Sequence, residues 1–228
     1  MSDDEEEEKV LKVVLLGQSG VGKTCIISQF INHSFDKNVV TSTGGSYACK
    51  QMIFKEFDNQ KIMFEIWDTA GQERYRSLTQ IFYKDASIAI LVYDITSAKS
   101  FEELKNYWYN QIKECAPKDI IIGVCGNKED LVDKEQVSFG EAKSFADDIG
   151  AMFGVVSALT SAGIENMFYE VGLKYLNPKY KGDLNENKEK SKNDNGEKRE
   201  GKGKTYKLDN NNTNDNKKKK KKCCKWKF

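Results

Sequence analysis

The sequence predicts a three-layer α/β fold, in which helices cover both faces of a mostly parallel β-sheet. Short apolar runs of strand length alternate with longer segments of helical periodicity, and this alternation is typical of parallel sheets. The segments 46–57 and 61–67 flank Asp58-Asn59-Gln60, which is a turn signal. They predict a hairpin that adds one antiparallel edge strand to the sheet.

Each remaining element follows from a local signal. Apolar runs predict strands at 10–16, 87–93, 120–125 and 153–156. A first helix is expected from about Gly22, and a second begins near Ser97 or Ser100. In the second, apolar side chains recur at helical spacing, at Phe101, Leu104, Tyr107, Trp108, Ile112 and Cys115. Helix 138–149 is expected to end at Gly150, and helix 164–176 to end before Pro178.

Composition divides the 228 residues into three parts. Residues 1–8 include six consecutive acids and are expected to be disordered. Residues 9–176 contain enough apolar side chains for one domain. Residues 177–228 are nearly free of apolar side chains and carry 18 Lys or Arg against 8 Asp or Glu, a net charge of +10, so a disordered tail is expected. The sequence has no apolar run of membrane-spanning length and no signal-peptide segment.

A glycine-rich motif directly follows the first predicted strand. Gly17-Gln18-Ser19-Gly20-Val21-Gly22-Lys23-Thr24 fits the pattern Gly, four residues, Gly-Lys-Thr, between a strand and a helix. In such a loop several backbone N–H groups and the following helix end point at phosphate. Lys23 can reach the outer phosphates, and the Thr24 hydroxyl can hold Mg²⁺. The fold class is therefore that of a P-loop NTPase, with nucleotide contacts expected from Ser19, Gly20, Val21, Gly22, Lys23, Thr24 and Cys25.

A second motif predicts which base is bound. Asn127-Lys128-Glu129-Asp130 follows the apolar run 120–125. The Asp130 carboxylate can accept two hydrogen bonds from the N1 and N2 edge of guanine, and adenine offers no such pair of donors. An unpaired buried acceptor costs about 1–3 kcal/mol, so Asp130 would select against ATP.

A third motif, Asp68-Thr69-Ala70-Gly71-Gln72-Glu73, closes the strand 61–67. Asp68 can hold Mg²⁺ through water, Gly71 can approach a γ-phosphate, and Gln72 can orient the attacking water. The order and spacing of the three motifs resemble those of the small GTPases of the Ras superfamily, and the resemblance covers residues 9–176.

Further segments resemble the Rab family. They are the stretch from Trp67 to Leu78, Phe82-Tyr83-Lys84-Asp85-Ala86, and Leu91-Val92-Tyr93-Asp94-Ile95-Thr96. The resemblance implies that Phe35 stacks on guanine and that Ser42 holds Mg²⁺ in the first switch, with Thr43 as the alternative ligand. It also implies base contacts from Ser157 and Ala158. Leu159 stands where the family usually has lysine, which removes that residue's contribution.

The resemblance implies a GTP/GDP switch that regulates vesicle trafficking and hydrolyses GTP, with Gln72 as the catalytic residue and Mg²⁺ as the cofactor. Expected partners are effectors that read the switches, an exchange factor (GEF), a GTPase-activating protein (GAP), a GDP-dissociation inhibitor (GDI) and the prenylation machinery. Tyr47, Trp67 and Tyr83 are candidates for an effector-facing aromatic patch, although Trp67 equally suits sheet packing. The alternative is a pseudo-GTPase scaffold that holds nucleotide without cycling. No recognition element for nucleic acid accompanies the lysines, and a monomer is expected.

The tail ends in a candidate membrane anchor. Lys217 to Lys222 precede the adjacent Cys223 and Cys224, and two lipids with a polybasic patch suffice for stable attachment. Rab tails commonly carry paired cysteines that receive geranylgeranyl groups, and here Lys225-Trp226-Lys227-Phe228 follow them. Trp226 and Phe228 offer an alternative, in which aromatic side chains insert into the membrane interface. The location expected is the cytoplasmic face of an intracellular membrane, in exchange with the cytosol.

Overall fold

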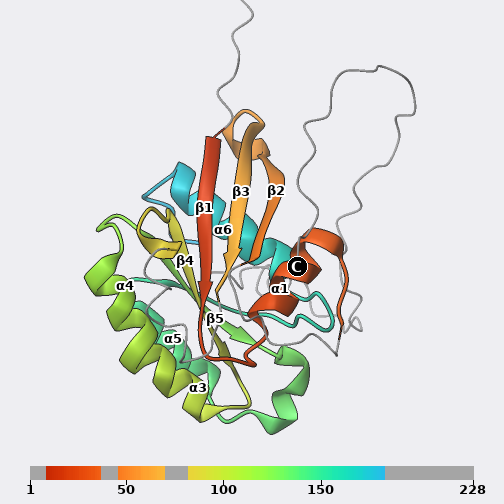
Figure 1. The fold of residues 1–228 in the computed structure, drawn as a ribbon, viewed down its shortest axis with the longest axis vertical. Coiled ribbons are helices and arrows are strands. Elements are labelled where there is room, and N and C mark those ends of the chain that lie inside the picture. Colours follow the sequence, from red (N-terminus) through yellow and green to blue (C-terminus); the bar gives the residue numbers. More distant parts are fainter. Residues whose placement is uncertain (1–8, 37–45, 70–81, 183–228) are drawn as a thin grey trace, which may run out of the picture.

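The computed structural model describes residues 9–36, 46–69 and 82–182 of the chain, and its centre is one six-stranded sheet (Figure 1). The strand order is β2-β3-β1-β4-β5-β6. The edge strand β2 runs antiparallel to β3, and the other neighbours are parallel. The strands are β1 (Lys9–Leu16), β2 (Ser46–Phe54), β3 (Gln60–Asp68), β4 (Ile88–Asp94), β5 (Ile121–Asn127) and β6 (Met152–Val155).

Helices pack on both faces of this sheet. They are α1 (Lys23–Asn32), α3 (Ala98–Glu103), α4 (Tyr109–Cys115), α5 (Phe139–Asp148) and α6 (Ile164–Leu176). Successive β1 side chains point to opposite faces, as in any strand. Leu11, Val13 and Leu15 enter the core formed with α1 and α6, whereas Val14 and Leu16 enter the core formed with α3, α4 and α5. The predicted three-layer fold with one antiparallel edge strand is confirmed.

The helix predicted from Ser97 to Cys115 forms in three pieces. The Ser97 hydroxyl caps α3 by accepting a hydrogen bond from the Ser100 N–H at 3.3 Å. A π-helical turn, Leu104–Trp108, then separates α3 from α4. Leu104, Trp108 and Ile112 are spaced four residues apart and are all buried in one core cluster.

The predicted hairpin also forms, with a longer connection than the turn signal indicated. A 3₁₀ turn, Lys55–Phe57, follows β2, and Asp58 and Asn59 take left-handed backbone conformations. Gln60 was expected in the turn and instead begins β3, opposite Phe54. A last short helix, Glu129–Lys134, follows β5 and belongs to the site described below.

Residues 177–182 lie against the end of α6. The Tyr180 hydroxyl donates to Glu170 Oε2 at 2.6 Å, and Lys174 Nζ donates to the carbonyls of Pro178 and Tyr180 at 2.9 and 2.7 Å. In the same helix, the Tyr169 hydroxyl donates to Glu56 beside the hairpin turn. The described chain therefore ends near the β2–β3 turn, at the opposite end of the sheet from the loop 17–22 that follows β1.

Gly172 in α6 fits against the ring of Phe54, which is fully buried and stacks on Tyr169. A Cβ at this position would overlap that ring, 2.7 Å from its Cε1, and would lie 3.0 Å from Phe64 Cζ. We expect Gly172→Ala to lower the free energy of unfolding, because overpacking costs about 1–3 kcal/mol and the helix-propensity gain is about 1 kcal/mol. Urea unfolding of the purified protein measures the change.

Gly140 in α5 provides the matched control, because a Cβ there meets nothing within 4 Å. Gly140→Ala should stabilise the protein by up to about 1 kcal/mol. Equal stabilisation by both substitutions would contradict the packing described around Gly172.

Candidate functional site: a nucleotide-binding site at the carboxyl ends of the strands

The sequence motifs meet where the parallel strands end. The loop 17–22 follows β1, Asp68 is the last residue of β3, and Asn127 is the last residue of β5. Two hydrogen bonds join these ends: Thr24 Oγ1 to Asp68 Oδ2 at 2.6 Å, and Asn127 Nδ2 to the Val21 carbonyl at 2.8 Å. In open α/β sheets, ligands bind in this position (Figure 1).

Glycine is required at two positions of the loop 17–22. Gly17 has φ 151° and Gly22 has φ 97°, and both values are unfavourable for other residues. A Cβ at Gly17 would overlap the Val92 carbonyl oxygen, and one at Gly22 would overlap the Asn127 amide. The glycines therefore let the loop lie directly against the ends of β4 and β5, with the N-terminus of α1 behind it.

Lys23 is buried in this loop, with 5% of its surface exposed. Its Nζ donates to the carbonyls of Gly17 and Gln18 at 2.8 and 3.1 Å. Burial lowers the pKa of Lys23 to about 8, and the nearby Asp68 carboxylate opposes this shift. An anionic ligand in the loop would favour the charged form of Lys23 further, so the loop is suited to phosphate.

Thr24 and Asp68 place a hydroxyl and a buried carboxylate oxygen 2.6 Å apart. Thr69, the next residue, donates from its hydroxyl to the Leu15 carbonyl at 2.6 Å and fixes the end of β3 against β1. Hard oxygen donors of this kind fit Mg²⁺. Beside Thr24, burial raises the pKa of the Cys25 thiol, with a further contribution from Asp68, so the thiol stays protonated.

Asn127 joins three segments of the site. Its Nδ2 donates to Val21 in the glycine-rich loop, and its Oδ1 accepts from the Ala158 N–H at 3.1 Å. The side chain is 2% exposed. The motif Asn127-Lys128-Glu129-Asp130 predicted a base site here but did not reveal this bridging role, because the two partners of Asn127 lie 106 and 31 residues away in the chain.

Asp130 and Ser157 also come together as predicted base-site residues. The Ser157 hydroxyl donates to Asp130 Oδ1 at 2.5 Å and accepts from the Thr160 N–H at 3.1 Å. Asp130 is exposed at the surface of the site, whereas Ala158 is buried. Leu159 is 45% exposed and presents an apolar side chain where the family usually has lysine.

Lys128 is held by a residue that sequence analysis left without a role. Its Nζ lies 2.6 Å from Asp94 Oδ2. Asp94 ends β4 and is 8% exposed, so its side chain does not face solvent as that of a strand-end residue often does. The pairing of β4 with β5 places Asp94 directly beside Asn127.

The aromatic patch differs from its prediction in one member. Tyr47 and Trp67 lie 5.2 Å apart between ring centroids, but the third ring is Phe82, 5.7 Å from Trp67. Tyr83 is 1% exposed and directs its hydroxyl to Gln111, so it cannot face an effector. We call Tyr47, Trp67 and Phe82 the aromatic patch.

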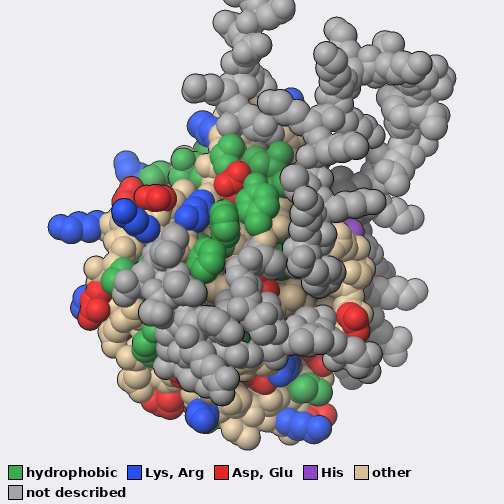
Figure 2. All heavy atoms as spheres, in the orientation of Figure 1, with side chains coloured by type: hydrophobic (Ala, Val, Ile, Leu, Met, Phe, Trp, Pro, Cys, Tyr) green, Lys and Arg blue, Asp and Glu red, His purple; other side chains and the backbone are tan. Residues whose placement is uncertain are grey.

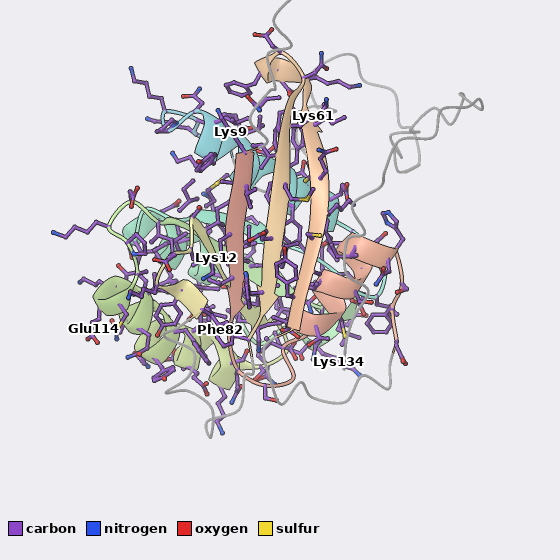
Figure 3. The ribbon with its side chains drawn as sticks, turned by 45° about the horizontal axis from the view of Figure 1, so that its top comes forward. Lys9, Lys12, Lys61, Phe82, Glu114 and Lys134 are labelled. Carbon is purple, nitrogen blue, oxygen red and sulfur yellow. The ribbon has the colours of Figure 1, made fainter. Side chains whose placement is uncertain are left out.

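The aromatic patch lies on a part of the sheet that no described helix covers. Figure 2 shows apolar side chains over β1, β3 and β2 in the orientation of Figure 1. Lys12 extends over the Trp67 ring, with Nζ 5.4 Å from its centroid, and Figure 3 shows Lys12 and Phe82 beside β1.

Of the other predicted site residues, only Phe35 belongs to the described part of the chain. Phe35 follows α1 and packs, half-buried, against the core on the α1 side. Ser42, Thr43, Gly71, Gln72, Cys223 and Cys224 lie outside the described residues.

Comparison with known proteins shows the family to which the chain belongs. A family model described as the Ras family matches residues 12–177. The Ras-related protein Rab-22A of Homo sapiens is 41% identical over 161 residues, which span 71% of this chain and 81% of that protein. The Ras-related protein Rab-31 of Rattus norvegicus is 39% identical over 175 residues, 76% of this chain and 88% of that protein.

The fold and the joined motifs define a P-loop GTPase of the Ras superfamily. Within it, the chain belongs to the Rab family of small GTPases. It is accordingly a GTP hydrolase that binds GTP and GDP and acts in vesicle trafficking, and no observation favours the pseudo-GTPase alternative. Among the residues that the structure describes, no helix combines the length and apolar character needed to cross a membrane.

Proposed function

We propose that this protein switches between GTP-bound and GDP-bound forms at the site described above. The glycine-rich loop and Lys23 hold the phosphates, while Asn127, Lys128, Asp130, Ser157 and Ala158 form the guanine site. The observation that carries this assignment is the Asn127 side chain, whose two hydrogen bonds join the phosphate loop to the base loop. Phe35 stacks on the base from the end of α1.

Thr24 and Asp68, with Ser42 from the first switch, would hold Mg²⁺. When bound, the ion supplies positive charge to the phosphate oxygens. Thr24 donates its hydroxyl hydrogen to Asp68, which leaves the oxygen lone pairs of Thr24 available to the ion. The Asp68 carboxylate is close enough to Lys23 to favour the charged form of the lysine.

The chemical step requires a positioned water and stabilised charge. Gln72 orients the water through its side-chain amide, and Lys23 with the loop N–H groups stabilises the charge that develops on phosphate. The sequence provides no candidate for an arginine finger of its own, so hydrolysis should be slow alone and accelerated by a GAP. Loss of the γ-phosphate removes contacts that order the two switches, and effectors read that difference.

Substitution of Asp130 tests the guanine assignment. Asp130→Asn replaces one acceptor by a donor, which opposes the N–H groups of guanine and suits the carbonyl of xanthine. We expect GTP affinity to fall at least about tenfold, or about 1.4 kcal/mol, and xanthosine triphosphate to bind comparatively better. Competition against a fluorescent nucleotide measures both affinities.

Asp133→Asn is the matched control, because Asp133 lies on the same short helix and is exposed. It should leave both affinities unchanged. Unchanged GTP affinity in Asp130→Asn, with no gain for xanthosine triphosphate, would remove Asp130 from the base site.

The tail is proposed to anchor the protein to the cytoplasmic face of an intracellular membrane. Residues 177–182 lie at the end of the domain opposite the glycine-rich loop, so the tail leaves the domain on the side away from the nucleotide site. Lipids on Cys223 and Cys224 and the lysines 217–222 supply the attachment. The aromatic patch is the proposed effector surface, and a GEF, a GAP, a GDI and the prenylation machinery are the proposed regulatory partners of a monomer.

Replacing both tail cysteines by serine should release the protein into the cytosol and leave GTP binding unchanged. Lysines alone give an attraction that salt screens, whereas lipid burial contributes about 0.8 kcal/mol per CH₂. Membrane fractionation at physiological salt measures the release. If the double-serine variant stays bound, the lipid hypothesis is wrong, and attachment by charge and by insertion of Trp226 and Phe228 takes its place.

A further inference from the structure

Asp94 ends β4 beside the guanine loop, and its carboxylate has partners on both oxygens. Oδ1 accepts hydrogen bonds from the Thr96 N–H at 2.9 Å and from the Thr96 hydroxyl at 2.7 Å. Oδ2 lies 2.6 Å from Lys128 Nζ. Asp94 is 8% exposed and the Lys128 side chain 33% exposed, so the carboxylate is withdrawn from solvent and the ammonium is partly so.

The partner, Lys128, has an unusual backbone. Its φ of 71° lies in the left-handed region, which residues other than glycine rarely occupy and which persists only where the surroundings hold it. Lys128 stands between Asn127, which joins the loops, and Asp130, which bonds Ser157. Its conformation therefore determines the path of the chain from the end of β5 to Asp130.

Asp94 is itself fixed by rigid elements. Its N–H donates to the Ser100 hydroxyl at 3.0 Å, in the first turn of α3. The next residue, Ile95, donates from its N–H to the Asn127 carbonyl at 3.1 Å. The Asp94 carboxylate, which ends β4 and is held by α3, is thus a fixed negative charge beside Lys128.

We propose that Asp94 is a positioning residue for guanine nucleotides. Its charge holds Lys128, and through the backbone of Lys128 it places Asp130 for the edge of the base. This inference rests on the proposed function, since it requires that Asp130 meets guanine. Asp94 acts on retention of the nucleotide and leaves hydrolysis of bound GTP unaffected, because Lys23 is held by Gly17 and Gln18 and not by Asp94.

Asp94→Asn separates the charge from the local turn. Asparagine keeps an Oδ1 acceptor for Thr96 and forms the same kind of turn, but it sets an amide NH₂ against the Lys128 ammonium. We expect a fluorescent GDP analogue to dissociate about tenfold faster from the full-length variant, with single-turnover GTP hydrolysis within about twofold of wild type. Asp147→Asn, which removes an exposed ion pair with Lys143 in α5, should leave both rates unchanged.

Two further variants separate the ion pair from the turn that Thr96 forms with Asp94. Thr96→Val removes a hydroxyl bond to Oδ1 and keeps the ion pair, so GDP dissociation should change less than about twofold. Lys128→Met should accelerate dissociation, and Asp94→Asn added to it should contribute little more, because interacting residues are not additive. Equal acceleration by Thr96→Val, full additivity with Lys128→Met, or no acceleration in Asp94→Asn would each overturn the proposal.

The proposed function fails in a different way. If it is wrong, Asp130→Asn gains no affinity for xanthosine triphosphate. If Asp130→Asn does switch its preference while Asp94→Asn has no effect, only the positioning role of Asp94 is lost.

Discussion

Asn127→Ala should lower the affinity for GTP and GDP by about a hundredfold, or about 2.7 kcal/mol. The substitution removes the donor to Val21 and the acceptor for the Ala158 N–H, both in a site where Asn127 is 2% exposed. Each buried group left unpaired costs about 1–3 kcal/mol, and the phosphate loop and base loop lose their common tether. Isothermal titration of nucleotide-free protein measures the loss for both nucleotides.

Asn110→Ala is the control for Asn127→Ala. It removes one exposed hydrogen bond, from Asn110 Nδ2 to the Asn106 carbonyl at 2.9 Å in α4, and should leave affinity unchanged. Nucleotide affinity within a few-fold of wild type in Asn127→Ala would show that the loops are placed without this side chain.

Lys23→Met should abolish tight GTP binding and, at neutral pH, stabilise the nucleotide-free domain. The pKa of Lys23 falls from 10.5 to about 8 on burial, so the charged lysine is disfavoured in the folded state. Methionine relieves that penalty, by at most about 3 kcal/mol, and the loss of the donor to Gly17 and Gln18 reduces the gain. Thermal unfolding of both nucleotide-free proteins measures it.

The pH dependence of this difference has a definite sign. Between pH 8 and 10.5 the unfolded chain keeps the Lys23 proton while the folded domain releases it, so wild-type stability rises with pH through this window. The advantage of Lys23→Met should be fully present below about pH 8 and should disappear toward pH 10.5. An advantage that grows with pH would show that Lys23 is not desolvated in the folded domain.

Much of the fold could be predicted because buried strands appear in the sequence as short apolar runs. The runs that became β4 and β5 are apolar since both sheet faces are covered there. Ser138 and Gly150 marked the ends of α5 by the chemistry of helix termini, and Gly163 precedes α6 in a left-handed conformation. Motif spacing then placed the phosphate and base loops at strand ends.

Other features depend on contacts between distant segments, and the sequence does not reveal them. Whether Phe82 or Tyr83 belongs to the aromatic patch depends on the rotation of the backbone at these two residues. In the structure Phe82 meets Trp67, and the Tyr83 hydroxyl donates to Gln111. The role of Asp94 depends on the pairing of β4 with β5. Turn propensity identified Asp58-Asn59-Gln60, but cross-strand pairing with Phe54 drew Gln60 into β3.

The central claim, that this protein is a cycling GTPase, is tested most directly by phosphate release from the GTP-loaded full-length chain. The account predicts slow release by the protein alone, on the order of 10⁻⁴ per second, and strong acceleration by a cytosolic extract. The Gln72→Leu variant should bind GTP normally, and the extract should not accelerate its phosphate release, because only the orientation of water is lost. Stable GTP binding by the wild type with no phosphate release, in the presence of extract as well as in its absence, would contradict the account and identify a scaffold that holds nucleotide without cycling.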